Sequence, residues 1–199
     1  MTEPIYSRRR VEDVLTKTKL QPSCRIIPRR HFETPLGTTP GDSRFGTKAD
    51  GFTVLYVSPD FDTAFVETVV RDRFARRGKR EIRLVEVTER AWALITSKAS
   101  KRVNLLDLRN DGCVRLGAPT DAVNARTHAA GRALARAIHA EHPDIDGFLW
   151  SSRLTAGDVY AVFNRAVGKL VATESGSLPD HPLLIDTLSK YRIKLTRGT

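Results

Sequence analysis

The sequence has few of the residues that define several common protein classes. Only two of its 199 residues are cysteine, Cys24 and Cys113, and they form no CxxC pair and lie near no histidine at zinc-ligand spacing. A disulfide framework uses more cysteine than this, so a reducing compartment is favoured. No apolar run approaches the roughly 20 residues of a membrane span. No apolar segment follows the basic residues near Met1, as it would in a signal peptide. We therefore expect a cytoplasmic protein without a membrane partner.

The histidines are also too scattered to form a metal site. None of the five makes a pair at metal-ligand spacing; they are His31, His128, His139, His142 and His181. His128 lies in a long helical pattern and could approach a site, although a surface or packing role is more usual for such a residue. We expect no bound metal.

What the chain does have is a sizeable core and a strong positive charge. With 40% hydrophobic and 28% charged residues it can fold as a globular domain, and its net charge is +10. Such a charge attracts polyanions, or draws a phosphate-bearing ligand into a cleft. The basic residues are spread along the chain, and there is no zinc finger, RNP motif or clear helix-turn-helix. A solvated surface and a basic nucleic-acid-binding module are both compatible with this pattern.

The periodicity of apolar residues predicts an irregular mixture of strands and helices. Without a steady βαβ repeat, the pattern favours an α+β fold over a doubly wound α/β fold. Residues 1–20 are expected to be an N-terminal extension or short helix, residues 21–199 a single domain, and residues 33–51 a long loop. Expected strands are 24–28, 53–58, 81–88, 103–108, 147–152 and 159–163; expected helices are 60–77, 119–141 and 182–190.

Four segments stand out because each combines apolar residues with a side chain suited to nucleotide chemistry. They are Arg25-Ile26-Ile27, Ser43-Arg44-Phe45-Gly46, Leu55-Tyr56-Val57 followed by Thr63-Ala64-Phe65-Val66-Glu67, and Asp146-Gly147-Phe148-Leu149-Trp150-Ser151-Ser152-Arg153. In order and spacing this set resembles the RES domain, which is named for its arginine, glutamate and serine. The resemblance covers about residues 25–165 and leaves a helical tail at the C-terminus.

The resemblance implies an ADP-ribosyltransferase-like fold of short strands with flanking helices. It also implies that the protein binds NAD as a substrate and cleaves the nicotinamide–ribose bond, with water or inorganic phosphate as the acceptor and without a metal. Proteins similar to this one are toxins that deplete NAD. They are held inactive by a helix-turn-helix antitoxin of the Xre type, so nucleic acid is contacted indirectly, through that partner. A homo-oligomer is compatible with the resemblance.

The residue types suit this chemistry. Arginine forks bind phosphate oxygens bidentately, so Arg25 and Arg44 are the candidates for the pyrophosphate, with Arg30 as an alternative to Arg25. An aromatic face such as that of Tyr56 can shape the pocket around nicotinamide or ribose. A carboxylate stabilises the cationic ribose that forms when the glycosidic bond breaks, which is the role for Glu67.

The same residues also have ordinary structural interpretations. On a regular helix Glu67 lies four residues before Arg71, away from the apolar face, which predicts an exposed ion pair. Arg44 could be a surface residue, and Tyr56 a core tyrosine. The family pattern selects Ser152 over Ser151. The hydroxyl of Ser152 can hydrogen-bond a ribose or phosphate oxygen, and we expect it to orient the substrate by engaging the ribose together with Glu67. The sequence thus predicts an NAD-cleaving toxin with Arg44, Glu67 and Ser152 at its catalytic centre. Transfer of ADP-ribose to a protein and nucleic-acid binding are the alternatives.

Overall fold

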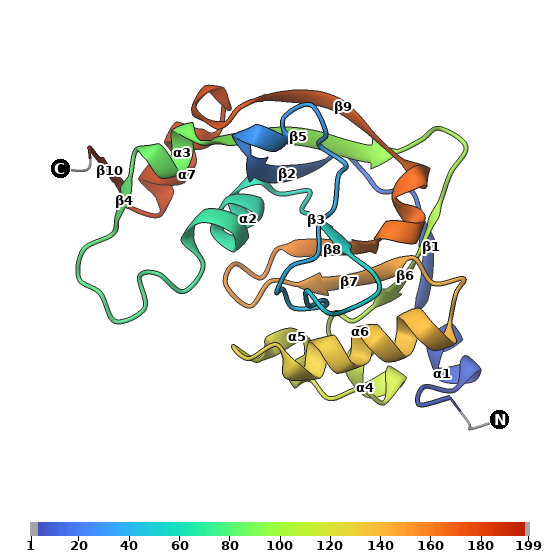
Figure 1. Cartoon of the computed structure of the whole chain (residues 1–199). Helices are drawn as coiled ribbons and strands as arrows, with labels where there is room; N and C mark the ends of the chain where they lie inside the picture. The colour runs from blue at the N-terminus through green and yellow to red at the C-terminus, as the bar shows by residue number, and fades with distance from the viewer. Residues whose placement is uncertain (1–3, 198–199) are drawn as a thin grey trace.

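Two β-sheets form the frame of the molecule (Figure 1). In the computed structural model, which describes residues 4–197, one sheet has five strands in the order β1-β6-β7-β8-β3, and the other has three in the order β2-β5-β9. The first sheet consists of β1 (Leu15–Thr18), β3 (Val54–Val57), β6 (Val103–Asp107), β7 (Gly147–Ser151) and β8 (Asp158–Phe163); the second consists of β2 (Ser23–Pro28), β5 (Arg90–Ser97) and β9 (Leu170–Ser177). All neighbours in these sheets are antiparallel except β6 and β7. A parallel pair, β4 (Glu81–Arg83) with β10 (Lys194–Thr196), stands apart.

The five-stranded sheet is buried on both faces. Phe148 and Trp150 of β7 join a core cluster with the helical layer, whereas Leu149 between them joins a cluster shared with β5 of the other sheet. Alternate residues of a strand point to opposite faces, so β7 is apolar throughout rather than alternating. The helical layer is formed by α1 (Arg8–Asp13), α4 (Gly112–Leu116), α5 (Asp121–Asn124) and α6 (Ala129–Glu141) (Figure 1).

A third cluster lies at one end of the two sheets. It is formed by α2 (Phe61–Phe65), the π-helical turn η2 (Val66–Val70), Trp92 of β5, and α7 (Leu184–Lys190). The remaining short elements are α3 (Val85–Thr88), η1 (Arg29–His31), η3 (Asn164–Lys169) and η4 (Leu178–Asp180). Within residues 4–197, no helix has both the length and the apolar composition that crossing a bilayer requires.

The α+β prediction is confirmed, and most of the expected elements are present. The strands expected at 24–28, 53–58, 103–108, 147–152 and 159–163 and the helix at 182–190 are found within a few residues of their expected bounds. Residues 32–53, all of which are described, contain no helix or strand, in agreement with the expected long loop. In the leading segment the helix ends before Leu15, which begins β1.

Three expected elements are wrong in form. The strand expected at 81–88 is the short β4 followed by α3, because pairing with β10 covers three residues and Leu84 then starts a helical turn. The helix expected at 60–77 ends at Arg71, which has a positive φ of 49°. The helix expected at 119–141 is divided into α5 and α6, because Ala125 is extended (ψ 153°). Strands β5 and β9 were not expected at all.

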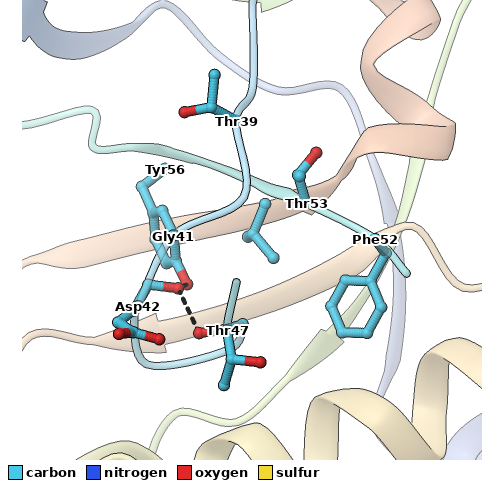
Figure 2. Close-up of a pocket in the computed structure, with 10 residues that line it drawn as sticks. Thr39, Gly41, Asp42, Thr47, Phe52, Thr53 and Tyr56 are labelled. Carbon is cyan, nitrogen blue, oxygen red and sulfur yellow. Dashed lines mark hydrogen bonds between the residues drawn. The ribbon is translucent and has the colours of Figure 1, made fainter. Parts of the chain in front are cut away.

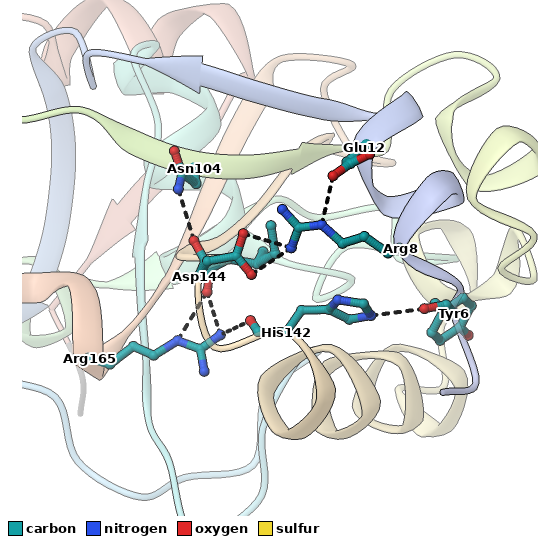
Figure 3. A network of polar contacts seen from close by, with 8 residues as sticks. Tyr6, Arg8, Glu12, Asn104, His142, Asp144 and Arg165 are labelled. Atoms are coloured by element: carbon teal, nitrogen blue, oxygen red, sulfur yellow. Dashed lines mark hydrogen bonds and ion pairs between the residues drawn. The ribbon is translucent and has the colours of Figure 1, made fainter. Parts of the chain in front are cut away.

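A polar network joins the N-terminal segment to the turn before β7 (Figure 3). Arg8 donates from Nη1 to both carboxylate oxygens of Asp144, each at 2.8 Å, and from Nε to Glu12 at 2.8 Å. The imidazole of His142 lies 2.9 Å from the carbonyl oxygen of Tyr6. Val11 and Val14 add apolar contacts to the helical-layer cluster. Because β1 also pairs with β6, this segment closes one edge of the five-stranded sheet.

Candidate functional site

Glu67 lies on a distorted turn, which changes where its side chain points. The helix begins normally, with Asp60 accepting a hydrogen bond from the Thr63 amide at 2.9 Å. One turn later it widens, and the amide of Arg71 donates to the carbonyl of Val66, five residues back, at 2.6 Å. Such π-bulges are rare and are frequently found at functional sites. The regular helical wheel that put Glu67 on a solvated face therefore does not apply.

The ion pair expected between Glu67 and Arg71 is not what the structure contains. Arg71 donates from Nε to the main-chain carbonyl of Glu67 at 3.2 Å. The Glu67 carboxylate instead accepts, at Oε1, a hydrogen bond of 2.5 Å from the hydroxyl of Ser152, 85 residues away in the chain. This contact brings the two residues together from different elements.

Ser152 follows directly after β7 and is held from several sides. Its side chain is buried, with 2% exposure, and its hydroxyl accepts from the amides of Leu154 (3.1 Å) and Thr155 (3.3 Å). Ser151, the alternative serine, ends β7 opposite Asp158 of β8. Of the two serines, Ser152 is the one that contacts Glu67.

A pocket of about 250 Å³ opens between β2, β3 and η2, and Glu67 lines it together with Arg25 and Tyr56. We call it the glutamate pocket; its other lining residues include Cys24, Thr63, Ala64, Thr68 and Val159. A bridge between Cys24 and Ser58 holds β2 against β3, with the Cys24 amide 2.7 Å from the Ser58 carbonyl. That bridge places Arg25 on one strand next to Tyr56 on the other.

Arg25 is largely buried in the glutamate pocket. It donates to the carbonyl of Pro35 in the long loop, and burial lowers the pKa of its guanidinium to about 10. A cation desolvated in this way gains from an anionic ligand, which would restore the electrostatic stabilisation lost with water. Arg30, the alternative phosphate ligand, lies on η1 and is exposed.

Tyr56 connects the glutamate pocket to the long loop. Its hydroxyl lies 2.9 Å from the hydroxyl of Ser43 and accepts from the amide of Phe45 at 3.1 Å. Its ring meets Trp150 edge-on, with 6.1 Å between centroids. Burial raises the pKa of the phenol to about 12, so it is neutral near neutral pH. Tyr56 thus acts both as a pocket wall and as the anchor of the segment that carries Arg44.

Arg44 directly follows Ser43, whose hydroxyl contacts Tyr56. Its guanidinium donates to the carbonyl of Ala125 from both terminal nitrogens at 3.1 Å, at the break between α5 and α6. Desolvation lowers the pKa of Arg44, and the negative charge of Glu67 opposes that shift. Arg44 is therefore within electrostatic reach of Glu67, but it does not line the glutamate pocket with Arg25. Next to it, burial and then the charges of Arg44 and Arg132 lower the pKa of His128.

A second, larger pocket of about 500 Å³ lies beside the first (Figure 2). We call it the loop pocket because the long loop and β3 form its walls; it is lined by Thr39, Gly41, Asp42, Ser43, Gly46, Thr47, Phe52, Thr53, Val54 and Tyr56. Figure 2 shows Tyr56 and Asp42 on one side and Phe52 on the other. Tyr56 is common to both pockets.

Sequence reasoning did not find Ser43 or Arg132 as site residues. Arg132 donates from Nε to the carbonyl of Ser43 at 2.9 Å and so fixes the loop from α6. Ser43 stands next to Arg44 in the motif, but nothing in the sequence distinguishes Arg132 from the other arginines of its helix. Within residues 4–197, no group of three or more His, Cys, Asp or Glu side chains is arranged to hold a metal ion.

Comparisons with known proteins identify a family and a similar fold. The sequence matches the RES domain family over residues 23–184. It is 37% identical over 106 residues to a Sinorhizobium fredii (strain NBRC 101917 / NGR234) protein described as "Probable toxin y4kH"; the match covers 52% of this chain and 80% of that protein. The fold is similar to a chain of the M. tuberculosis MbcT–MbcA toxin–antitoxin complex, with a TM-score of 0.58 and 14% identity over 85% of this chain and 90% of that one.

Proposed function

The chain belongs to the RES domain family, and on that premise we propose that it is the toxin of a toxin–antitoxin pair and cleaves the nicotinamide–ribose bond of NAD. The observation that carries this proposal is the hydrogen bond from Ser152 to Glu67 at the wall of a pocket that also contains Arg25 and Tyr56. These residues come from separate segments of the chain, and their proximity supports joint action on one ligand. The toxin role is supported by the name of the similar S. fredii protein and by the complex in which the similar fold occurs.

The reaction needs little acid–base assistance. When the bond between ribose C1′ and the nicotinamide nitrogen breaks, the electron pair leaves with nitrogen, and the pyridinium becomes neutral nicotinamide. No proton has to be supplied to this leaving group. The ribose becomes an oxocarbenium-like cation, which a nearby carboxylate stabilises. Among the described residues that line the glutamate pocket, Glu67 is the one acid.

An acceptor then completes the reaction. Water or inorganic phosphate adds to C1′ and gives up a proton, which Glu67 can receive or pass to solvent. With water as the acceptor the products are nicotinamide and ADP-ribose. With phosphate as the acceptor they are nicotinamide and ADP-ribose 1″-phosphate. Arg25 binds the pyrophosphate, Arg44 contributes positive charge from the opposite side, and Tyr56 shapes the space for the nicotinamide riboside. Ser152 orients the Glu67 carboxylate.

The test is direct. Purified protein is incubated with NAD, with and without phosphate, and free nicotinamide is measured. We expect turnover in the wild type and loss of at least roughly 100-fold in Glu67→Gln, since a charge-stabilising group of this kind contributes several kcal/mol. Glu174→Gln, the same substitution at an exposed position on β9, is the matched control and should keep wild-type activity. No nicotinamide release by the wild type, or equal release by Glu67→Gln, contradicts the proposal.

The same experiment separates the alternatives. With labelled NAD, label retained on a macromolecule identifies ADP-ribosyl transfer to a protein. Steeply salt-dependent nucleic-acid binding without any NAD chemistry identifies a basic binding module instead.

The partner in this proposal is a helix-turn-helix antitoxin of the Xre type that covers the site. The toxin then acts on the NAD of the cytoplasm when the antitoxin is lost. Co-expression with the product of a neighbouring reading frame should restore growth and suppress nicotinamide release. A frame whose product neither binds the toxin nor protects the cells contradicts this assignment of the partner.

A further inference from the structure

The loop pocket has the chemistry of a sugar site. Five of its lining residues carry hydroxyl groups and one carries a carboxylate: Thr39, Ser43, Thr47, Thr53 and Tyr56, with Asp42. Among the described residues that line it there is no lysine or arginine. Hydroxyls and a carboxylate suit the hydroxyl groups of a ribose, whereas a phosphate requires donors and positive charge.

The position of the loop pocket also fits a dinucleotide. Tyr56 lines both pockets, so the two pockets adjoin at its side chain. The loop pocket is the larger of the two. A dinucleotide has two nucleoside ends joined by a pyrophosphate, and the larger pocket suits the bulkier adenosine end.

We propose that the loop pocket binds the adenosine half of NAD and that Asp42 accepts hydrogen bonds from its ribose hydroxyls, making the enzyme selective for NAD over NADP. This deepens the proposed function and rests on it. The 2′-phosphate of NADP would bring negative charge against the Asp42 carboxylate and would have no ribose proton to offer it.

Arg132 lies beside Asp42 and increases the expected effect of removing Asp42 on the selectivity for NAD over NADP. Its Nη2 lies 3.9 Å from an oxygen of Asp42, while its Nε is held by the Ser43 carbonyl. With Asp42 present, the two charges offset each other at the edge of the pocket. Without Asp42, the guanidinium of Arg132 is left to attract a 2′-phosphate.

The first experiment measures NAD and NADP binding by calorimetry in a Glu67→Gln background, which prevents turnover. We expect the parent to bind NAD more tightly than NADP. Asp42→Asn should shift the ratio of the two affinities toward NADP by roughly tenfold or more, as expected for one hydrogen bond to a charged group. Asp186→Asn, the same charge change on α7, should leave the ratio unchanged. An unchanged ratio in Asp42→Asn overturns the inference.

A second variant tests the pocket itself. A Cβ built on Gly46 meets only Ser43 Oγ at 3.5 Å and Val54 Cγ2 at 3.7 Å, both from lining residues, so a side chain added there starts at the wall of the loop pocket. Gly46→Leu should weaken NAD binding by roughly tenfold or more. Binding of nicotinamide mononucleotide, which lacks the adenosine half, should not change. Equal losses for both ligands, or no loss for either, overturn the inference.

Failure of this inference and failure of the proposed function give different results. If the wild type releases nicotinamide from NAD but neither variant discriminates as described, the assignment of the loop pocket is wrong and the cleavage activity stands. If the wild type releases no nicotinamide and the Glu67→Gln protein binds neither dinucleotide, both proposals are overturned together.

Discussion

The hydroxyl of Ser152 donates to Glu67 at 2.5 Å while accepting from two main-chain amides. A serine hydroxyl has one donor and two acceptor positions, so all three are engaged by the protein. The side chain is also buried, with 2% exposure. We therefore propose that Ser152 acts through Glu67, by fixing the orientation of its carboxylate, and not by contacting the ribose as the sequence led us to expect.

This arrangement predicts a non-additive pair of variants. Ser152→Ala should lower kcat for nicotinamide release by roughly 10- to 100-fold, the range for one hydrogen bond to a charged group, with little change in KM. Combining it with Glu67→Gln should be no worse than Glu67→Gln alone, since both act on one group. Ser151→Ala is the control and should retain activity. Additive losses in the double variant would show that Ser152 has an independent catalytic role.

Arg25 and Arg30 should respond differently to substitution. Arg25 lines the glutamate pocket, whereas Arg30 is exposed on η1. Arg25→Ala should raise KM for NAD by roughly tenfold or more through loss of a charge-assisted contact to phosphate. Arg30→Ala, which removes the same charge, should leave KM within about twofold. Steady-state kinetics on both variants distinguish the two, and the reverse result would assign the phosphate to Arg30.

Part of this site was predictable from the sequence, for reasons visible in particular residues. Strand β7 contains the apolar run Phe148-Leu149-Trp150 directly before the two serines, because both of its faces are buried, and such a run is easily recognised. The order of the motifs supplied Arg25, Arg44, Tyr56 and Glu67. Their positions relative to one another depend on the bridge between β2 and β3, which no local pattern encodes.

The orientation of Glu67 illustrates why the other features of the site could not be predicted from the sequence. Periodicity assumes a regular helix, and the π-helical turn at Val66–Val70 rotates the side chain away from the expected face. Likewise, Ala125 lies within a sequence rich in helix formers, yet its extended conformation presents its carbonyl to Arg44. In both places a tertiary contact at the site outweighs local propensity. Strand β5 was not predicted because its alanines weaken the pattern that is typical of a strand.

Gly131 of α6 should be sensitive even to alanine. A Cβ built there would lie 2.6 Å from the carbonyl oxygen of Arg44 and 2.7 Å from that of Ala122, so main-chain atoms must move. Gly131→Ala should lower the free energy of unfolding by about 1–3 kcal/mol, although alanine is the better helix former. Nicotinamide release should fall as well, because the displaced segment carries Arg44. Gly168→Ala, where the added Cβ meets nothing within 4 Å, is the matched control in urea unfolding. Equal stability of the two variants would mean that the close approach is not needed.

The buried phenol of Tyr56 should make the free energy of unfolding depend on pH in the alkaline range. Its pKa rises from the ordinary value of 10 to about 12 because the phenol is buried. The folded chain therefore holds this proton more tightly than the unfolded chain. The resulting stability is fully present below about pH 10 and is lost as the pH rises through about 12. In that window the free energy of unfolding should fall with a slope that includes up to one proton from Tyr56, about 1.4 kcal/mol per pH unit.

Tyr56→Phe removes that proton and should flatten the slope by the same amount, even though the loss of the bonds to Ser43 and Phe45 makes the variant less stable at neutral pH. Urea unfolding of both proteins at several pH values above about 9 measures the two slopes, and their difference cancels the contributions of the other buried tyrosines and of Cys24. Parallel slopes would mean that the phenol is not desolvated in the folded protein. In that case the side chain of Tyr56 would be in contact with water, contrary to its proposed role as a desolvated wall beside the nicotinamide riboside.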